Sequence, residues 1–371
     1  MEKKTVQELT DIRILGRTTF CEGALNLFWT GSGLDFCFDG SVLSLHLSSD
    51  YMFFEAWLSV EIDGTVLARF PVQKGESTIC LLRGLMRGTR HRVRIFKDTQ
   101  AMHDDSLHFL QILGLEYRGE ILPPPAAEKR IEFIGDSVTS GEGAIGAPEG
   151  QDWISAYFSS YHNYSRMTAD ALHADYRCLS QSGWGVLSAW DNNPHQVLPQ
   201  YYGQICGLVG GEHNLAAGAH ATYDFSSWKT DIVVVNLGAN DDAAFDRPEW
   251  RDKKSGESFQ EHLLPDGSYD PADAERLRQA VKDFLKKIRK CNPDAFIVWC
   301  YGMLGHRLTG LLDKAVGEYR TESGDLRAYY LMLPDTTPET IGARSHPGVK
   351  SHAAASKTLV KFIREHFNGT D

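Results

Sequence analysis

The sequence has no long hydrophobic run and no leader-like start. No stretch reaches the roughly 18 consecutive apolar residues that suggest a membrane helix. The opening residues, MEKKTVQELTDIRILG, carry charge but lack the apolar core and small-residue cleavage site of a signal peptide. We therefore expect a cytoplasmic protein that does not bind membranes, unless a leader has been removed from the chain.

Cysteine pairs are also missing. The 7 cysteines are odd in number, lie far apart and include no C-x-x-C pair. This pattern disfavours a disulfide framework and a structural zinc site. Free thiols in a reducing compartment are the expectation.

Positive charge is in short supply. Lys and Arg total 38 against 49 Asp and Glu, which gives a formal net charge of -11. Such a surface repels phosphate backbones and anionic lipid, so nucleic acid is not expected as a partner. The 42% hydrophobic and 23% charged residues are typical of a folded protein and exclude disorder and coiled coil.

The first third of the chain reads as strands. Short runs rich in β-branched and aromatic residues follow one another from residue 12 to about residue 119, and several alternate apolar and polar side chains, as in residues 42–47. Ile62-Asp63-Gly64 lies between two such runs and predicts a hairpin turn. We expect an all-β sandwich over residues 1–122.

Three consecutive prolines, Pro123-Pro124-Pro125, then predict a stiff linker over residues 123–129. After it, near-continuous apolar runs alternate with amphipathic stretches. Strands are expected at 131–135, 176–180, 231–238, 295–302 and 328–333, with one helix starting at Asp270-Pro271 and a last one at Pro347. This alternation predicts a second domain, residues 130–371, with a parallel sheet of about five strands between helices.

Four residues are candidates for catalysis: three follow these strands and the fourth precedes the last helix. Ser137 comes after the first strand in FIGDS, Gly183 after the second in SGWG, Asn240 after the third in NLGAND, and His346 precedes the last helix. A serine hydroxyl with a histidine base and N–H donors is the equipment of acyl transfer. Each alone also suits a helix cap or a turn. The carboxyl ends of parallel strands lie at one edge of the sheet, where active sites gather.

The order Ser, Gly, Asn, His resembles the SGNH or GDSL hydrolase superfamily over about residues 130–368. The resemblance implies Ser137 as nucleophile and His346 as base. It also implies an oxyanion hole made by the N–H groups of Ser137 and Gly183 and by the side chain of Asn240, with no metal or organic cofactor.

The wider arrangement, a jelly-roll-like β domain followed by IEFIGDSVTSGEG, SGWG, VVVNLGAND and HPGVKSH, is similar to carbohydrate esterase family 2. This likeness implies removal of acetyl groups from acetylated xylan or its oligosaccharides. A short-acyl or lipid esterase, a sugar O-acetyltransferase and a sugar-binding protein with an idle hydrolase domain are the alternatives. The role of the β domain and the oligomeric state stay open.

Two further residues carry expectations. The superfamily usually places an aspartate three residues before the histidine, but that position is Ala343 here. Either a backbone carbonyl orients His346, which we favour, or a carboxylate, Asp335 or Glu339, folds back to it. Trp184 follows Gly183 directly, so it is a candidate for substrate binding, with core packing as the alternative.

Overall fold

The structure is a computed structural model that describes residues 1–367 and divides into two compact units. The first, called here the β unit, comprises residues 1–127, 152–161 and 203–223. The second, the α/β unit, comprises residues 128–151, 162–202 and the chain from residue 224 onward. The first crossing between them follows Ala127, inside the proline-rich segment.

The β unit is built on antiparallel strands. Within residues 1–127, ten strands belong to one hydrogen-bonded network: β1 (Glu2–Thr5), β2 (Arg13–Leu15), β3 (Thr18–Cys21), β4 (Ala24–Leu27), β5 (Gly33–Asp50), β6 (Trp57–Ile62), β7 (Thr65–Pro71), β8 (Gly75–Arg83), β9 (His91–Lys97) and β10 (Phe109–Leu122). The short helix η1 (Val6–Glu8) follows β1. The predicted all-β domain is confirmed.

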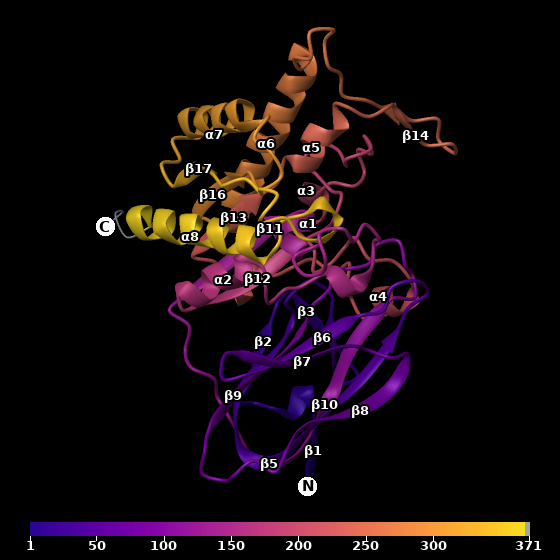
Figure 1. The fold of residues 1–371 in the computed structure, drawn as a ribbon, viewed down its shortest axis with the longest axis vertical. Helices are drawn as coiled ribbons and strands as arrows, with labels where there is room; N and C mark the ends of the chain where they lie inside the picture. Colours follow the sequence, from indigo (N-terminus) through magenta and orange to yellow (C-terminus); the bar gives the residue numbers. More distant parts are fainter. Residues whose placement is uncertain (368–371) are drawn as a thin grey trace. The chain divides into compact units, whose positions relative to one another are not determined.

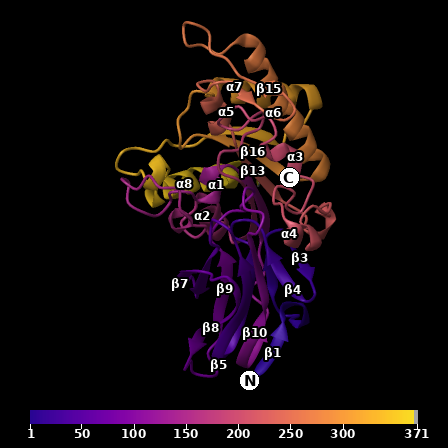
Figure 2. The same cartoon turned by 90° about the vertical axis from the view of Figure 1, so that its right-hand side faces the viewer.

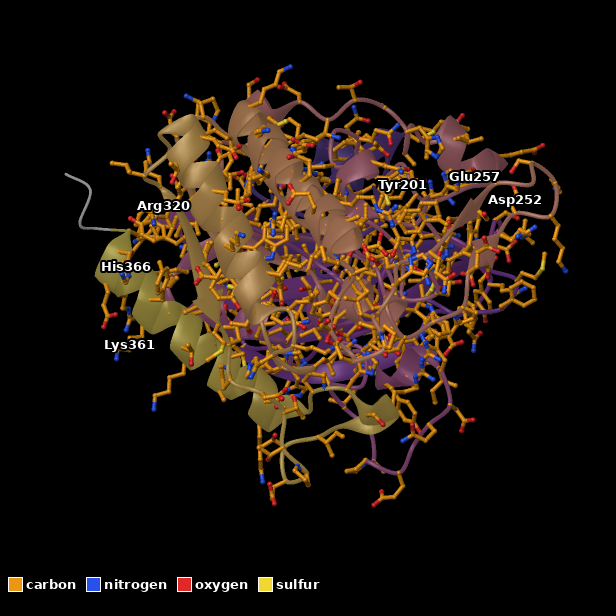
Figure 3. The ribbon with its side chains drawn as sticks, turned by 90° about the horizontal axis from the view of Figure 1, so that it is seen from above. Tyr201, Asp252, Glu257, Arg320, Lys361 and His366 are labelled. Carbon is orange, nitrogen blue, oxygen red and sulfur yellow. The ribbon has the colours of Figure 1, made fainter. Side chains whose placement is uncertain are left out.

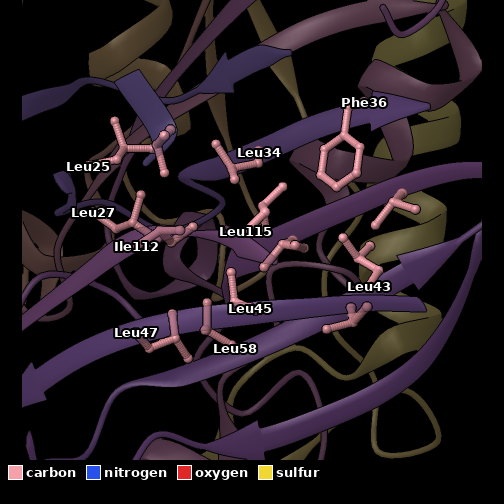
Figure 4. Close-up of a cluster of buried hydrophobic side chains, with 14 of the residues drawn as sticks. Leu25, Leu27, Leu34, Phe36, Leu43, Leu45, Leu47, Leu58, Ile112 and Leu115 are labelled. Atoms are coloured by element: carbon pink, nitrogen blue, oxygen red, sulfur yellow. The ribbon is translucent and has the colours of Figure 1, made fainter. Parts of the chain in front are cut away.

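The long strand β5 connects the parts of this network. Its residues 33–38 pair with β9, its residues 42–49 pair with β8, and β10 pairs with it along most of its length. One hydrophobic core lies between these strands (Figure 4). The predicted alternation is confirmed, because Leu43, Leu45 and Leu47 are fully buried whereas the neighbouring polar side chains are less so.

The turn between β6 and β7 also follows the prediction. Asp63 and Gly64 have φ of 51° and 86°, so both residues lie in the left-handed region. This pair of positive φ values fits a tight hairpin that matches the twist of the strands, and glycine adopts it without steric cost.

Two later segments of the chain complete the β unit. Residues 152–161 include η2 (Ser155–Tyr157), and residues 203–223 include α4 (Glu212–Ala216). The indole N–H of Trp29 donates to the carbonyl of Ile205 (2.6 Å), and the N–H of Ser160 donates to the buried carboxylate of Asp98 (2.7 Å). The expectation of a continuous second domain over residues 130–371 therefore needs correction, since these segments satisfy buried polar groups of the β unit.

The α/β unit has a parallel sheet at its centre. In the described part of this unit, five strands run in the order β12 (Ala174–Ser180), β11 (Lys129–Gly135), β13 (Ile232–Asn236), β16 (Phe296–Tyr301) and β17 (Ala328–Met332). Its helices are α1 (Ser137–Ser140), α2 (Tyr164–Ala171), α3 (Leu198–Tyr201), α5 (Ala239–Ala244), α6 (Pro271–Cys291), α7 (Thr309–Ser323) and α8 (Val349–His366), with the short turns η3 (Phe225–Ser227) and η4 (Ala343–Ser345). The predicted five-stranded sheet is confirmed.

Helices cover both faces of this sheet (Figures 1 and 2). One face packs against α2 and α8 through a core that includes Phe133, Val234 and Leu359. On the other face, the ring of Phe284 from α6 meets Trp299 of β16 at 6.3 Å between centroids. Because both faces are covered, the strands are apolar almost throughout, as the sequence indicated.

The helix starts follow local chemistry. The Asp270 side chain accepts hydrogen bonds from the N–H groups of Ala272 (2.8 Å) and Asp273 (3.2 Å), which confirms the predicted cap of α6. The last helix begins at Val349, two residues later than predicted. Pro347 instead forms a bridge with Ile341, and this pairing keeps the chain extended up to Gly348.

A hairpin of β14 (Trp250–Arg251) and β15 (Ser258–Phe259) extends from the α/β unit. Figure 3 shows Asp252 and Glu257 on this hairpin, far from Lys361 and His366 of α8. Over residues 1–367, no helix combines the length and the apolar character needed to span a bilayer.

Candidate active site

The site begins where β11 turns into α1. Asp136 caps the short helix by accepting the N–H of Val138 (3.0 Å), and Ser137 is its first residue. The turn is tight, because a Cβ at Gly135 would lie 2.0 Å from Thr139 Oγ1 and 2.8 Å from the Asn236 carbonyl. Only glycine fits there, and the serine hydroxyl is placed at the carboxyl edge of the sheet.

His346 reaches this serine from the loop before α8. Its Nε2 lies 2.9 Å from Ser137 Oγ, and its Nδ1 lies 2.8 Å from the backbone carbonyl oxygen of Arg344. A carbonyl can only accept, so Nδ1 carries the hydrogen and Nε2 is free to accept from the serine hydroxyl. This tautomer suits a general base.

The Arg344 backbone carbonyl therefore orients His346, as we favoured from the sequence. Asp335, the alternative partner, accepts instead from the N–H groups of Gly305 and Thr336, each at 2.9 Å. A charge-bearing triad through Asp335 does not form in this structure.

An unusual backbone presents that carbonyl. Arg344 and Ser345 have φ of 59° and 55°, in the left-handed region. The N–H of Arg344 donates to the carbonyl of Gly150 (2.7 Å), and the N–H of Ala343 donates to that of Gly143 (3.0 Å). These bonds tie the histidine loop to the segment that follows α1, so the strained conformation is held by its surroundings.

The two other predicted residues lie at the ends of the neighbouring strands. Gly183 follows β12 with φ of 81°, and Asn240 follows β13. Asn240 Nδ2 donates to the Trp184 carbonyl (3.0 Å) and more weakly to Asp136 Oδ2 (3.3 Å). Burial raises the pKa of Asp136 to about 7.

Asp241 is a residue whose part in the site the sequence did not disclose. Its carboxylate accepts the N–H groups of Val186 (3.0 Å), Leu187 (2.8 Å) and Ser188 (3.3 Å). It thereby fixes the loop that follows Gly183, and burial raises its own pKa. Its partners lie more than 50 residues away along the chain, so no local pattern could have indicated them.

Trp184, the tryptophan expected to contact substrate, is buried, whereas the nearby Trp190 is exposed. Trp184 is only 3% exposed and packs its ring against Tyr201 at 5.3 Å between centroids, so it belongs to the core. Trp190 is 45% exposed, and its backbone N–H donates to the Gly183 carbonyl (3.0 Å). The Arg247 guanidinium lies 4.9 Å from its ring centroid. The aromatic surface beside Gly183 is therefore Trp190.

Glu142 is a second residue that the sequence reasoning missed. It lies in the GEG turn directly after α1, is almost fully buried, and pairs with Arg344 at 3.1 Å. An acidic side chain so close to the serine was the available signal. Among residues 1–367, no three His, Cys, Asp or Glu side chains gather in a way that would hold a metal ion.

Two family models match this chain. Residues 14–125 match the model described as Carbohydrate esterase 2 N-terminal. Residues 133–333 match the GDSL-like Lipase/Acylhydrolase family.

Solved structures resemble the whole chain. An acetyl xylan esterase (Est2A) from the rumen bacterium Butyrivibrio proteoclasticus superposes with a TM-score of 0.97 at 39% identity, covering 100% of this chain and 99% of that one. A family two carbohydrate esterase from Clostridium thermocellum, in complex with cellohexaose, superposes with a TM-score of 0.78 at 27% identity, covering 96% and 99%.

A longer protein also contains a similar sequence. The Cellulase/esterase CelE of Acetivibrio thermocellus is 29% identical over 343 residues, which is 91% of this chain but 37% of that protein. The Acetylxylan esterase / glucomannan deacetylase of Cellvibrio japonicus is 23% identical over 362 residues, covering 95% of this chain and 88% of that protein.

Proposed function

Because this chain belongs to carbohydrate esterase family 2 of the SGNH (GDSL) hydrolases, we propose that it is an O-acetyl esterase acting on acetylated xylan or its oligosaccharides. The observation that carries the proposal is the linked set Ser137, His346 and the Arg344 carbonyl, joined at 2.9 Å and 2.8 Å. Its likeness over the full chain to an acetyl xylan esterase supports the substrate class.

In the proposed mechanism, Ser137 Oγ attacks the acetyl carbonyl carbon while His346 Nε2 takes the hydroxyl proton. The oxyanion is held by the N–H groups of Ser137 and Gly183 and by Asn240 Nδ2. Nε2 then gives its proton to the sugar oxygen, and the sugar leaves an acetyl-serine behind. Water, deprotonated by His346, releases acetate.

Trp190 is the proposed contact for the sugar. Its exposed ring lies beside Gly183, since a Cβ there would be 3.0 Å from Trp190 Cδ1, so a sugar that carries the reacting acetyl group can rest on it. The neutral substrate also suits the net charge of -11, which would oppose the approach of a polyanion.

The test is acetate release by the wild type and by Ser137→Ala and His346→Ala. Removing either partner is expected to lower kcat by at least about 1000-fold with the thermal unfolding midpoint preserved, because the two act as a unit. Wild-type activity in either folded variant would contradict the assignment.

The substrate panel consists of acetylated xylan, acetylated mannan and nitrophenyl esters of increasing acyl length. We expect the acetylated sugars to be preferred and activity to fall as the acyl chain grows. A preference for long acyl chains would support the lipid esterase instead, and acetyl transfer to an added sugar that outpaces hydrolysis would support the transferase.

A further inference from the structure

The base of this site has a neutral partner on one side of its ring. His346 Nδ1 donates to a backbone carbonyl, which carries no charge, and the position three residues before it is Ala343. When the ring takes the serine proton it becomes a cation. An anionic neighbour stabilises such a cation, and losing one costs orders of magnitude in related serine hydrolases.

A carboxylate does lie near the ring, on its other side. Glu142 Oε1 is 4.0 Å from His346 Nε2, the nitrogen that receives the proton. The Glu142 side chain is only 3% exposed, and its backbone N–H donates to the Ser137 carbonyl (3.0 Å). The turn that carries the nucleophile thus also carries this carboxylate.

Arg344 holds Glu142 in that place. Its Nε donates to Glu142 Oε1 (3.1 Å), and its Nη1 donates to the carbonyl of Gln151 (3.1 Å). The same residue supplies the carbonyl that binds Nδ1. Arg344 therefore contacts the base through its main chain and the carboxylate through its side chain.

The other titratable groups of the site have different partners. Asp136 binds the N–H of Val138 and the Asn240 amide. Asp241 binds the loop that follows Gly183. His352 is fully buried on α8, and burial lowers its pKa to about 3, so it stays neutral near pH 7.

The segment beside Glu142 is also fitted closely to the base. A Cβ at Gly143 would lie 2.2 Å from the Ala343 carbonyl oxygen and 2.7 Å from His346 Cβ. The loop bearing the base and the turn bearing Glu142 thus pack closely at Gly143, and the Arg344 side chain holds the carboxylate itself.

We propose that Glu142 is a positioning residue for His346: it supplies, from the nucleophile's own turn, the negative charge that the superfamily usually places before the histidine. The inference rests on the proposed function. As the Ser137 O–H bond breaks, the proton moves to Nε2 and the new positive charge forms 4.0 Å from the carboxylate. Glu142 exchanges no proton in this step.

The experiment compares Glu142→Gln with the wild type. Glutamine keeps the shape and an acceptor for Arg344 but removes the charge. We expect kcat to fall about tenfold or more. An opposite charge at this distance stabilises the charged form of a side chain by about one pKa unit or more, which corresponds to a factor of about ten. KM should change less than about twofold, because the substrate does not touch Glu142.

The pH profile separates this role from a structural one. Without the carboxylate the imidazolium is less stable, so the base stays deprotonated to lower pH and the acidic limb of kcat/KM moves to lower pH. A loss of kcat with an unmoved acidic limb would mean that the pair only braces the loop, and wild-type kinetics would also overturn the proposal.

Two further variants complete the design. Glu149→Gln removes one negative charge from the same loop at an exposed position and should leave both kcat and the limb unchanged. An equal shift in this control would overturn the proposal. If Glu142→Gln does not fold, Glu142→Asp replaces it, because the shorter side chain moves the carboxylate away from the ring. A lower kcat with a shifted acidic limb of kcat/KM supports the role, and an unmoved acidic limb rejects it.

The failure of the proposed substrate can be told apart from a failure of this role. The rate at which an alkyl fluorophosphonate labels Ser137 depends on the base but not on sugar recognition. If the wild type releases no acetate, the pH dependence of labelling in the wild type and in Glu142→Gln still tests the carboxylate.

Discussion

The main chain and the side chain of Arg344 contact different residues of the site. Its carbonyl fixes the tautomer of His346, and its guanidinium pairs with Glu142. The carbonyl belongs to every residue type, so the orientation of the base depends on the left-handed backbone at residues 344 and 345 more than on any side chain there. At this scale, function follows from φ angles as much as from residue identity.

Trp190 gives a prediction at the same scale. Trp190→Ala should raise KM for acetylated xylo-oligosaccharides about fivefold or more, because stacking on an aromatic side chain is worth about 1 to 3 kcal/mol for a nucleobase and we expect a similar contribution for a sugar ring. KM for nitrophenyl acetate, which has no sugar, should change little. Steady-state kinetics on both substrates measure the difference.

The control for this variant is Phe20→Ala in β3. Phe20 is 44% exposed, close to the 45% of Trp190, but it lies in the β unit. It should leave both KM values as in the wild type. Equal KM increases for the two substrates in Trp190→Ala would contradict a sugar contact.

The sequence predicted the linked pair Ser137 and His346 because each lies in a short motif beside a strand or helix end. It did not predict which tryptophan is exposed. Trp184 and Trp190 are six positions apart, and their burial depends on Tyr201 and Arg247, whose packing is a tertiary property. Glu142 escaped for the same reason, since its partner is more than 200 residues away.

At the scale of elements, the loop after β12 is anchored to segments from elsewhere in the chain. Asp241 at the start of α5 accepts its N–H groups, and the Ser188 hydroxyl donates to Glu261 (3.1 Å). Burial, together with the nearby negative charge of Asp241, raises the pKa of Glu261 to about 9. Near neutral pH this carboxyl is protonated in the folded protein.

The pH dependence of stability follows from that raised pKa. The folded state binds the Glu261 proton up to about pH 9, whereas the unfolded chain releases it near the ordinary value of 4.5. The free energy of unfolding therefore falls as pH rises through this window. Glu261→Gln removes the titrating group and keeps a neutral side chain of the same shape. Between pH 6 and pH 9 the wild type should lose on the order of 4 kcal/mol of unfolding free energy that Glu261→Gln does not lose.

Urea unfolding at the two pH values measures this difference. Glu257→Gln is the matched control, because Glu257 lies four residues before Glu261 but is exposed and pairs with His195 at the surface. Its stability should follow the wild-type pH dependence. A Glu261→Gln curve that also follows the wild type would contradict a protonated buried carboxyl.

Strands were easier to predict than helix starts. Each of the five strands of the α/β unit contains a short apolar run, so their number followed from hydrophobic pattern and spacing. The start of α8 was placed two residues early because Pro347 is also favourable as a first helical residue. A bridge between Ile341 and Pro347 decides that point, and such pairing is not visible in one segment alone.

For the whole molecule, the central fact is that the β unit draws on three stretches of chain. The proline-rich segment marked one crossing correctly in the sequence. The other crossings, around residues 151, 161, 202 and 223, carry no composition change that would reveal them. They depend on hydrogen bonds to distant groups, such as Arg17 to the Gln204 carbonyl (2.8 Å).

This organisation predicts the behaviour of a truncated chain. A fragment of residues 128–371 would keep Ser137 and His346 but expose segments 152–161 and 203–223, whose partners lie in residues 1–127. We expect it to aggregate or to unfold without cooperativity, because buried side chains such as Leu208 and Val209 lose their cover. Differential scanning calorimetry and binding of a hydrophobic dye compare it with the full chain.

A fragment that unfolds cooperatively near the midpoint of the full chain would contradict this expectation. Residues 1–127 alone provide the reciprocal measurement, and they should also be less stable than in the full chain because Trp29 and Asp98 lose partners. Mixing the two fragments should restore part of the acetate-releasing activity.

The repeated crossing of the chain has a consequence for inheritance. Two domains joined by one linker can be separated by a single recombination event and recombined with other partners. Here a break at the prolines would divide the β unit from two of its own pieces, so descendants of such an event would lose both halves. A similar sequence can form part of a longer protein, as in a relative of which it makes up 37%, but we expect the two units inside this chain to be inherited together.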